Sequence, residues 1–175
     1  MLIGFAFKVS AVPFHVWSPD VYQGAPSNIT AFMASVGKVA AFGAMLRVLT
    51  SALPFDRDDW RPIIWVLAVL SLVVGSLLAV VQTDVKRMLA FSSVSHAGFI
   101  LVGLEAAGLS AGESAMFSSV QSVAVYLGLY SVLVVGSFAV ISVASRGGDT
   151  TLDSFNGLSS RRPTLALALT VFLLA

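Results

Sequence analysis

Lys38 lies near the middle of an otherwise apolar stretch, AFMASVGKVAAFGAML. A charged ammonium group at the centre of a membrane helix costs at least about 2.5–3.5 kcal/mol, and ionisable groups kept in such places mostly mark ion or proton routes. A neighbouring charge that moves can load the amine with a proton or unload it. The alternative is a lysine that faces lipid and extends to the interface, although Lys38 is far from both ends of the stretch. We predict that Lys38 transfers protons.

Lys8 precedes a proline by five residues in the apolar segment that opens the sequence. Pro13 lacks an N–H group and crowds the carbonyl of Val9, so the helix is expected to break beside the lysine. Within a membrane, a broken helix is tolerated only where protein covers the freed backbone or where the backbone lines water. Lys8 could thus belong to a proton route, or it could stand at a helix end and reach the interface. The spacing of the residues leaves both interpretations open.

His15 and His96 are the two histidines of the chain. Histidine is the side chain whose charge changes near neutral pH, as a proton relay requires. Each could instead be a packing residue that is held by a hydrogen bond. Hydroxyl groups of Ser92, Ser93 and Ser95 accompany His96 in the sequence, which predicts a polar, hydrated stripe along that helix.

Metal and cofactor sites are not indicated in this chain. It has no cysteine and two histidines, which excludes thiolate-ligated iron–sulfur clusters and disulfides and argues against a multi-histidine metal site. A glycine-rich phosphate loop is also missing. The net charge of +1, without basic clusters, argues against nucleic acid as a partner. We expect no redox centre and no bound cofactor within these 175 residues.

Apolar segments long enough to cross a membrane must position these side chains. Hydrophobic residues make up 57% of the chain and charged residues 11%, with a mean hydropathy of +0.92, a composition typical of membrane proteins. A crossing needs about 20 apolar residues. The main apolar stretches run over residues 29–49, 63–81, 92–107 and 115–145.

The pattern predicts an all-α, multi-pass transmembrane helix bundle with a broken helix near Pro13. About four complete helices are expected, flanked by a partial helix that ends near Val12 and another that starts at Pro163. We interpret residues 1–175 as a single transmembrane domain fragment, cut at both ends from a longer protein. Small residues at helical spacing around Gly75 favour close contact between helices in lipid.

Three stretches resemble a known family of membrane proteins. The run FKVSAVPFHVWSPDVYQGAPSNITAFMASVGKVAAFGAMLRVL, Phe7 to Leu49, is similar to the signature of the antiporter-like subunits of NADH-quinone oxidoreductase (respiratory complex I). Its central piece PDVYQGAP, Pro19 to Pro26, resembles the N-type subunit in particular. TDVKRMLAFSSVSHAGFILVGL, Thr83 to Leu104, is similar to the same subunit, and LDSFNGLSSRRPTLALALTVFLLA, Leu152 to Ala175, resembles the stretch that leads into the family's next broken helix.

The resemblance implies a membrane subunit that couples electron transfer from NADH to quinone with proton translocation through buried lysines. Lys8 and Lys38 would match the lysines of the family's first broken helix and of the helix after it, and His15 and His96 match histidines of the same motifs. In the family, protons are held by buried lysines, histidines and waters near the mid-plane of the membrane. The family also uses a glutamate on an earlier helix and a charged residue on a later one, both outside this chain.

Partners and location are implied by the same resemblance. Other membrane and peripheral subunits of the complex would adjoin the chain within the lipid bilayer, in the plasma or inner membrane of a bacterium. The whole complex would use NADH, FMN, iron–sulfur clusters and quinone, none of which this chain would bind. The chain would be an enzyme only as a subunit of NADH:quinone oxidoreductase.

Two other functions stay open from the sequence. Mrp-type cation/proton antiporters share the lysine, proline and histidine framework of this family, so a transporter that acts alone is one alternative. A purely structural membrane subunit is the other. Lysines within two consecutive helices argue against a structural role, because buried charge is costly and is usually kept for a function.

Overall fold

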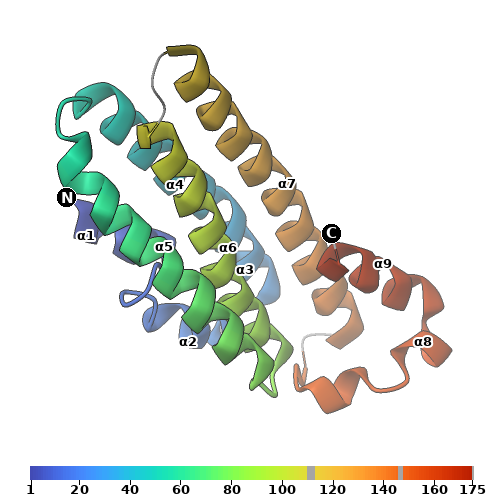
Figure 1. Cartoon of the computed structure of the whole chain (residues 1–175). Coiled ribbons are helices and arrows are strands. Elements are labelled where there is room, and N and C mark those ends of the chain that lie inside the picture. The colour runs from blue at the N-terminus through green and yellow to red at the C-terminus, as the bar shows by residue number, and fades with distance from the viewer. Residues whose placement is uncertain (110–112, 146–147, 175) are drawn as a thin grey trace.

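The computed structural model describes residues 1–109, 113–145 and 148–174. Within these ranges the chain folds into helices that are joined by short connections (Figure 1). The all-α, multi-pass bundle expected from the sequence is confirmed. Four helical segments are long and apolar enough to cross a membrane, namely Ser27–Ala52, Arg57–Val80, Val85–Leu109 and Ser114–Ser145.

Shorter helical elements complete the described chain. In the first long segment, one π-helical turn separates two α-helices and a second π-helical turn forms the C-terminal end. Helix α5 (Arg57–Val80) packs along α6 (Val85–Leu109), α6 packs against α7 (Glu113–Ser145), and α9 (Pro163–Leu174) lies against α7. The elements are α1 (Leu2–Val9), α2 (Trp17–Gly24), α3 (Ser27–Phe32), η1 (Met33–Gly37), α4 (Lys38–Arg47), η2 (Val48–Ala52), α5 (Arg57–Val80), α6 (Val85–Leu109), α7 (Glu113–Ser145), η3 (Leu152–Phe155), α8 (Leu158–Arg161) and α9 (Pro163–Leu174).

The chain leaves helical geometry between α1 and α2, where Pro13 is found. Ser10 follows α1 in the left-handed region, with φ of 61°, and the Val12–Pro13 peptide bond is cis. The Val12 N–H donates a buried hydrogen bond of 2.9 Å to Ser71 Oγ on α5. A side chain of another helix thus satisfies a backbone donor that the break sets free, as a membrane interior requires. The break predicted near Pro13 is confirmed.

Helices α5 and α6 approach each other closely at two glycines. A Cβ atom on Gly75 would lie 2.7 Å from the backbone nitrogen of Ser95, and one on Gly98 would lie 2.9 Å from that of Leu72. Neither position has room for a side chain, because the neighbouring atoms belong to rigid helical backbone. The small residues around Gly75 therefore create the helix contact that the sequence predicted.

Helix α6 begins earlier than hydropathy predicted. The apolar stretch starts at Ser92, whereas the helix starts at Val85 and includes Lys86 and Arg87. The Lys86 side chain is buried, and its Nζ donates a hydrogen bond of 2.8 Å to the carbonyl of Ala25, directly after the C-terminal end of α2. A cation is favoured at that place because unpaired carbonyls give a helix C-terminus partial negative charge. Contacts with α2 thus keep two charged residues within the first turn of α6.

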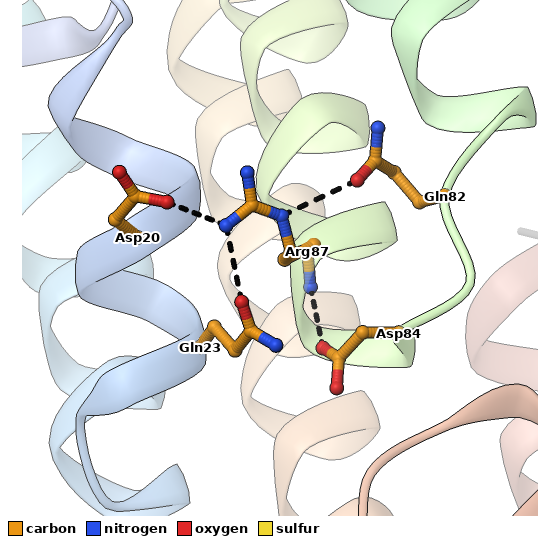
Figure 2. Close-up of polar contacts among 5 residues, drawn as sticks. All are labelled: Asp20, Gln23, Gln82, Asp84 and Arg87. Carbon is orange, nitrogen blue, oxygen red and sulfur yellow. Dashed lines mark hydrogen bonds and ion pairs between the residues drawn. The ribbon is translucent and has the colours of Figure 1, made fainter.

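Arg87 ties the start of α6 to α2 and to the loop that follows α5 (Figure 2). Its Nη1 donates to Asp20 at 2.5 Å and to Gln23 at 3.0 Å, and its Nε donates to Gln82 at 3.3 Å. Its backbone N–H donates at 3.0 Å to Asp84 Oδ1, which caps the helix. The second half of the broken helix is therefore fastened to α6 by side chains at one end of the bundle.

Asp84→Ala is expected to lower the melting temperature of the full-length subunit. Loss of a helix cap lowers the free energy of unfolding by about 1–2 kcal/mol. The Asp84 side chain is buried, and its second oxygen accepts a hydrogen bond of 2.5 Å from Thr150 Oγ1, which would lose its acceptor. Thermal unfolding in detergent measures the change. Asp58→Ala, at an exposed acid in the first turn of α5, is the control and should change the melting temperature less. Equal losses in the two variants would contradict the capping role.

Candidate functional site

Lys38 lies inside the helix bundle. It is the first residue of α4, directly after the π-helical turn η1, and its side chain is 3% exposed. At 1.5 Å per residue it lies about 17 Å along the helix from Ser27, near the middle of a hydrocarbon layer about 30 Å thick. Its Nζ donates a buried hydrogen bond of 2.5 Å to the backbone carbonyl of Ser93 on α6. The ammonium group therefore faces protein and not lipid.

The groups around the Lys38 ammonium are neutral dipoles. Its Nζ lies 5.9 Å from the centre of the Tyr130 ring on α7, a distance at which a cation is attracted to an aromatic face. The Tyr130 hydroxyl is 2.7 Å from Ser93 Oγ. Within the part of the chain that the structure describes, the two ion pairs are Arg61–Glu105 and Arg87–Asp20. No described carboxylate neutralises Lys38, so a charge that approaches it would strongly change its preference for the proton.

His96 joins the same group of side chains from one turn further along α6. Its Nδ1 lies 2.7 Å from the Tyr126 hydroxyl on α7, and its ring centre is 5.1 Å from that of Tyr130. The sequence predicted a polar stripe of serines beside His96, without naming a hydrogen-bond partner for the ring. The nearby serines have other partners instead, because Ser93 Oγ bonds to Tyr130 and Ser95 Oγ bonds to Ser76 on α5 at 3.0 Å.

Tyr126 and Tyr130 are the residues of this site that the sequence analysis missed. They are four residues apart on α7, so both hydroxyls lie on one face of the helix. Tyr130 is 3% exposed, and a tyrosine buried in an apolar span usually has a hydrogen-bond partner. Two tyrosines at this spacing in a membrane helix were the available signal for a polar contact. Their hydrogen-bond partners, however, lie on the preceding helix α6, 30 and 37 positions away along the chain.

A cavity of about 210 Å³ adjoins the site between α6, α7 and α9. Water takes up about 30 Å³ per molecule in the liquid, and a polar cavity of sufficient size can hold it. The volume has room for several water molecules beside His96 and Tyr130. Its polar lining consists of Ser92, Ser93, His96, Tyr130 and Ser137.

Lys8 and His15 lie outside this hydrogen-bonded group. Lys8 is on α1 and is exposed. His15 is half-buried in the break between α1 and α2, and its ring packs edge to face against Phe91 of α6, with the ring centres 6.2 Å apart. The structure therefore brings Lys38 and His96 together through Ser93 and two tyrosines. His15 contacts the same helix at a separate point.

Metal-ligating side chains do not gather anywhere in the described ranges. No group of three or more histidine, cysteine, aspartate or glutamate residues there could hold a metal ion. The arrangement of Lys38, Ser93, Tyr130, Tyr126 and His96 offers hydrogen bonds and protonatable nitrogens in a buried place. Groups of this kind can take up and release protons.

Comparison with known proteins matches the whole chain to one protein family. The family model described as "NADH:quinone oxidoreductase/Mrp antiporter, TM" covers residues 1–175. The NADH-quinone oxidoreductase subunit N of Rhodococcus opacus is 53% identical over 175 residues, which cover 99% of this chain and 31% of that protein. The chain spans about a third of the length of the curated relatives it matches.

Solved structures share the fold. A chain of respiratory complex I from Thermus thermophilus is 36% identical, with a TM-score of 0.79, and the match covers 99% of this chain and 36% of that one. A chain of the Mrp complex from Dietzia is 25% identical, with a TM-score of 0.83 over 98% of this chain and 30% of that one. Sequence identity is therefore higher to the complex I chain, while the fold is common to both.

Proposed function

The chain belongs to the NADH:quinone oxidoreductase/Mrp antiporter family of membrane proteins, and we propose that it is part of the proton-translocating subunit N of a bacterial NADH-quinone oxidoreductase. Relatives that are 49–53% identical carry this subunit's name and come from bacteria such as Rhodococcus and Mycobacterium. Four helices long and apolar enough to cross a membrane fit that role. The complex would couple electron transfer from NADH to quinone with proton movement through this subunit.

The observation that carries the proposal is the buried ammonium of Lys38, hydrogen-bonded to Ser93 and without a carboxylate partner among the described residues. Buried charge of this kind in a membrane helix is expensive and marks ion or proton routes. An approaching negative charge would favour the protonated lysine, and its withdrawal would favour release. In the proposed mechanism, electrical or conformational changes elsewhere in the complex load and unload Lys38.

His96 is the proposed exchange partner on the side of the polar cavity. The tyrosine bond to Nδ1 leaves Nε2 as the second ring nitrogen for a proton, and imidazole can take up and release protons near neutral pH. His15 is proposed as a relay at the broken helix, supported by its place beside α6. Lys8 is proposed to exchange protons with Lys38 through water, and it enters the proposal through the family motif alone.

The proposed complex would supply what this chain lacks. NADH, FMN, iron–sulfur clusters and quinone would be bound by other subunits, and lipid would surround the exposed apolar helices. The Mrp-type antiporter is the rival proposal, because the same fold occurs in the Mrp complex of Dietzia. The higher identity to subunit N and to the complex I chain favours the oxidoreductase.

Copurification tests the proposed function. The full-length subunit would be tagged in its own host and purified in mild detergent. Peripheral iron–sulfur subunits should copurify, together with NADH-dependent quinone reduction. Isolation of the subunit without them, with sodium-dependent proton exchange in vesicles, would favour the antiporter instead.

A further inference from the structure

Tyr130 touches both protonatable groups of the site. Its ring centre lies 5.9 Å from Lys38 Nζ and 5.1 Å from the centre of the His96 ring. The lysine is on α4, the histidine on α6 and the tyrosine on α7. One side chain from α7 therefore contacts the proton-binding groups of two other helices.

Ser93 links the tyrosine to the lysine a second time. The carbonyl of Ser93 accepts the hydrogen bond from Lys38 Nζ, while its Oγ is bonded to the Tyr130 hydroxyl at 2.7 Å. All three residues are almost fully buried, with exposures of 3% for Lys38, 2% for Ser93 and 3% for Tyr130. The two bonds share Ser93, so the place of each group depends on the others.

We propose that Tyr130 is a positioning residue that holds Lys38 and His96 in the arrangement needed for proton transfer between them. This inference rests on the function proposed above. The hydroxyl fixes Ser93, whose carbonyl receives the lysine, and the ring fixes the imidazole and the ammonium on its surface. Tyr130 does not itself gain or lose a proton in this scheme.

Two substitutions separate the hydroxyl from the ring. Tyr130→Phe keeps the ring contacts and removes the bond to Ser93, so proton pumping per assembled complex should fall about threefold to tenfold, the scale of one neutral hydrogen bond. Tyr130→Leu also removes the ring and should lower the rate further. Pumping would be measured in proteoliposomes that contain the complete complex, and both rates would be divided by the amount of assembled complex on native gels.

A double-mutant cycle distinguishes positioning from general support of the fold. Ser93→Ala removes the same hydrogen bond from its other side while leaving the carbonyl for Lys38. If Tyr130 acts through Ser93, Ser93→Ala should reproduce Tyr130→Phe, and the double variant should be no slower than either single one. Tyr126→Phe is the matched control. It removes a hydroxyl from the same face of α7, but that hydroxyl bonds to His96 and not to Ser93. Its effect should add to that of Ser93→Ala.

The outcomes separate this inference from the proposed function. The inference would be overturned by full pumping in both Tyr130→Phe and Tyr130→Leu, or by additive effects of Tyr130→Phe and Ser93→Ala. The proposed function would still stand in either case if Lys38→Met lost pumping. Full pumping in Lys38→Met would overturn the proposed function and this inference with it. A lower amount of assembled complex with a normal rate per complex would assign Tyr130 to folding only and would also overturn the inference.

Discussion

Replacing Lys38 with methionine in the full-length subunit is expected to lower proton pumping by about a hundredfold, the lower end of the range for loss of a proton-transferring group. Methionine is unbranched and similar in length, so it can fill the space between α4, α6 and α7. It cannot donate to the carbonyl of Ser93 or hold a proton. Proton uptake and quinone reduction would be measured together in proteoliposomes, with assembly checked on native gels.

Lys86→Met provides the matched control. Lys86 is also buried, and its Nζ also donates to a backbone carbonyl, that of Ala25. It lies at the start of α6, away from Tyr130 and His96, so its loss should lower the melting temperature while the pumping rate per assembled complex is kept. Equal loss of pumping in the two variants would show that any buried lysine is needed for packing and would contradict a specific role for Lys38.

Gly75→Ala is expected to have the second large effect, on stability and assembly. The new methyl group would lie 2.7 Å from the backbone nitrogen of Ser95 and 3.1 Å from the carbonyl oxygen of Phe91. Helical backbone cannot adopt another rotamer as a side chain can, so α5 and α6 must move apart. Overpacking of this kind lowers the free energy of unfolding by about 1–3 kcal/mol. Thermal unfolding and the yield of assembled complex measure the effect.

Gly43→Ala is the control for helix propensity alone. Gly43 is on α4, and a Cβ atom there would meet no atom within 4 Å. Alanine favours a helix over glycine by about 0.8–1.0 kcal/mol, so this variant should melt at the same temperature or higher. A loss of stability equal to that of Gly75→Ala would mean that close contact between α5 and α6 is not the cause.

The sequence was informative where one residue departs from its local pattern. Lys38 is a charge within an apolar stretch, and Pro13 cannot continue a helix, so the buried amine and the broken helix were both predictable. Gly75 was predictable as a contact residue from its small neighbours. Each of these signals lies within a few residues of the feature it predicts.

The partners of those residues were not predictable in the same way. Lys38 and Ser93 are separated by 55 positions, and His96 and Tyr126 by 30. Nothing in the local pattern says which faces of α4, α6 and α7 meet. The start of α6 was missed for a related reason, because Lys86 and Arg87 find their hydrogen-bond acceptors on and directly after α2. Hydropathy places charged residues such as these in a loop, whereas their tertiary contacts stabilise them within the helix.

The length of α7 constrains how the bundle fits its membrane. Its 33 residues extend about 50 Å at 1.5 Å per residue, whereas the hydrocarbon layer is about 30 Å thick. Such a mismatch is relieved by tilting or by letting one end emerge into the headgroups. The N-terminal part of α7 extends past the end of α6 (Figure 1). It exposes the polar side chains of Ser118, Gln121 and Ser122. The first turns of α7 are therefore suited to the headgroup zone, and a thinner bilayer would increase the inclination of the helix that carries Tyr126 and Tyr130.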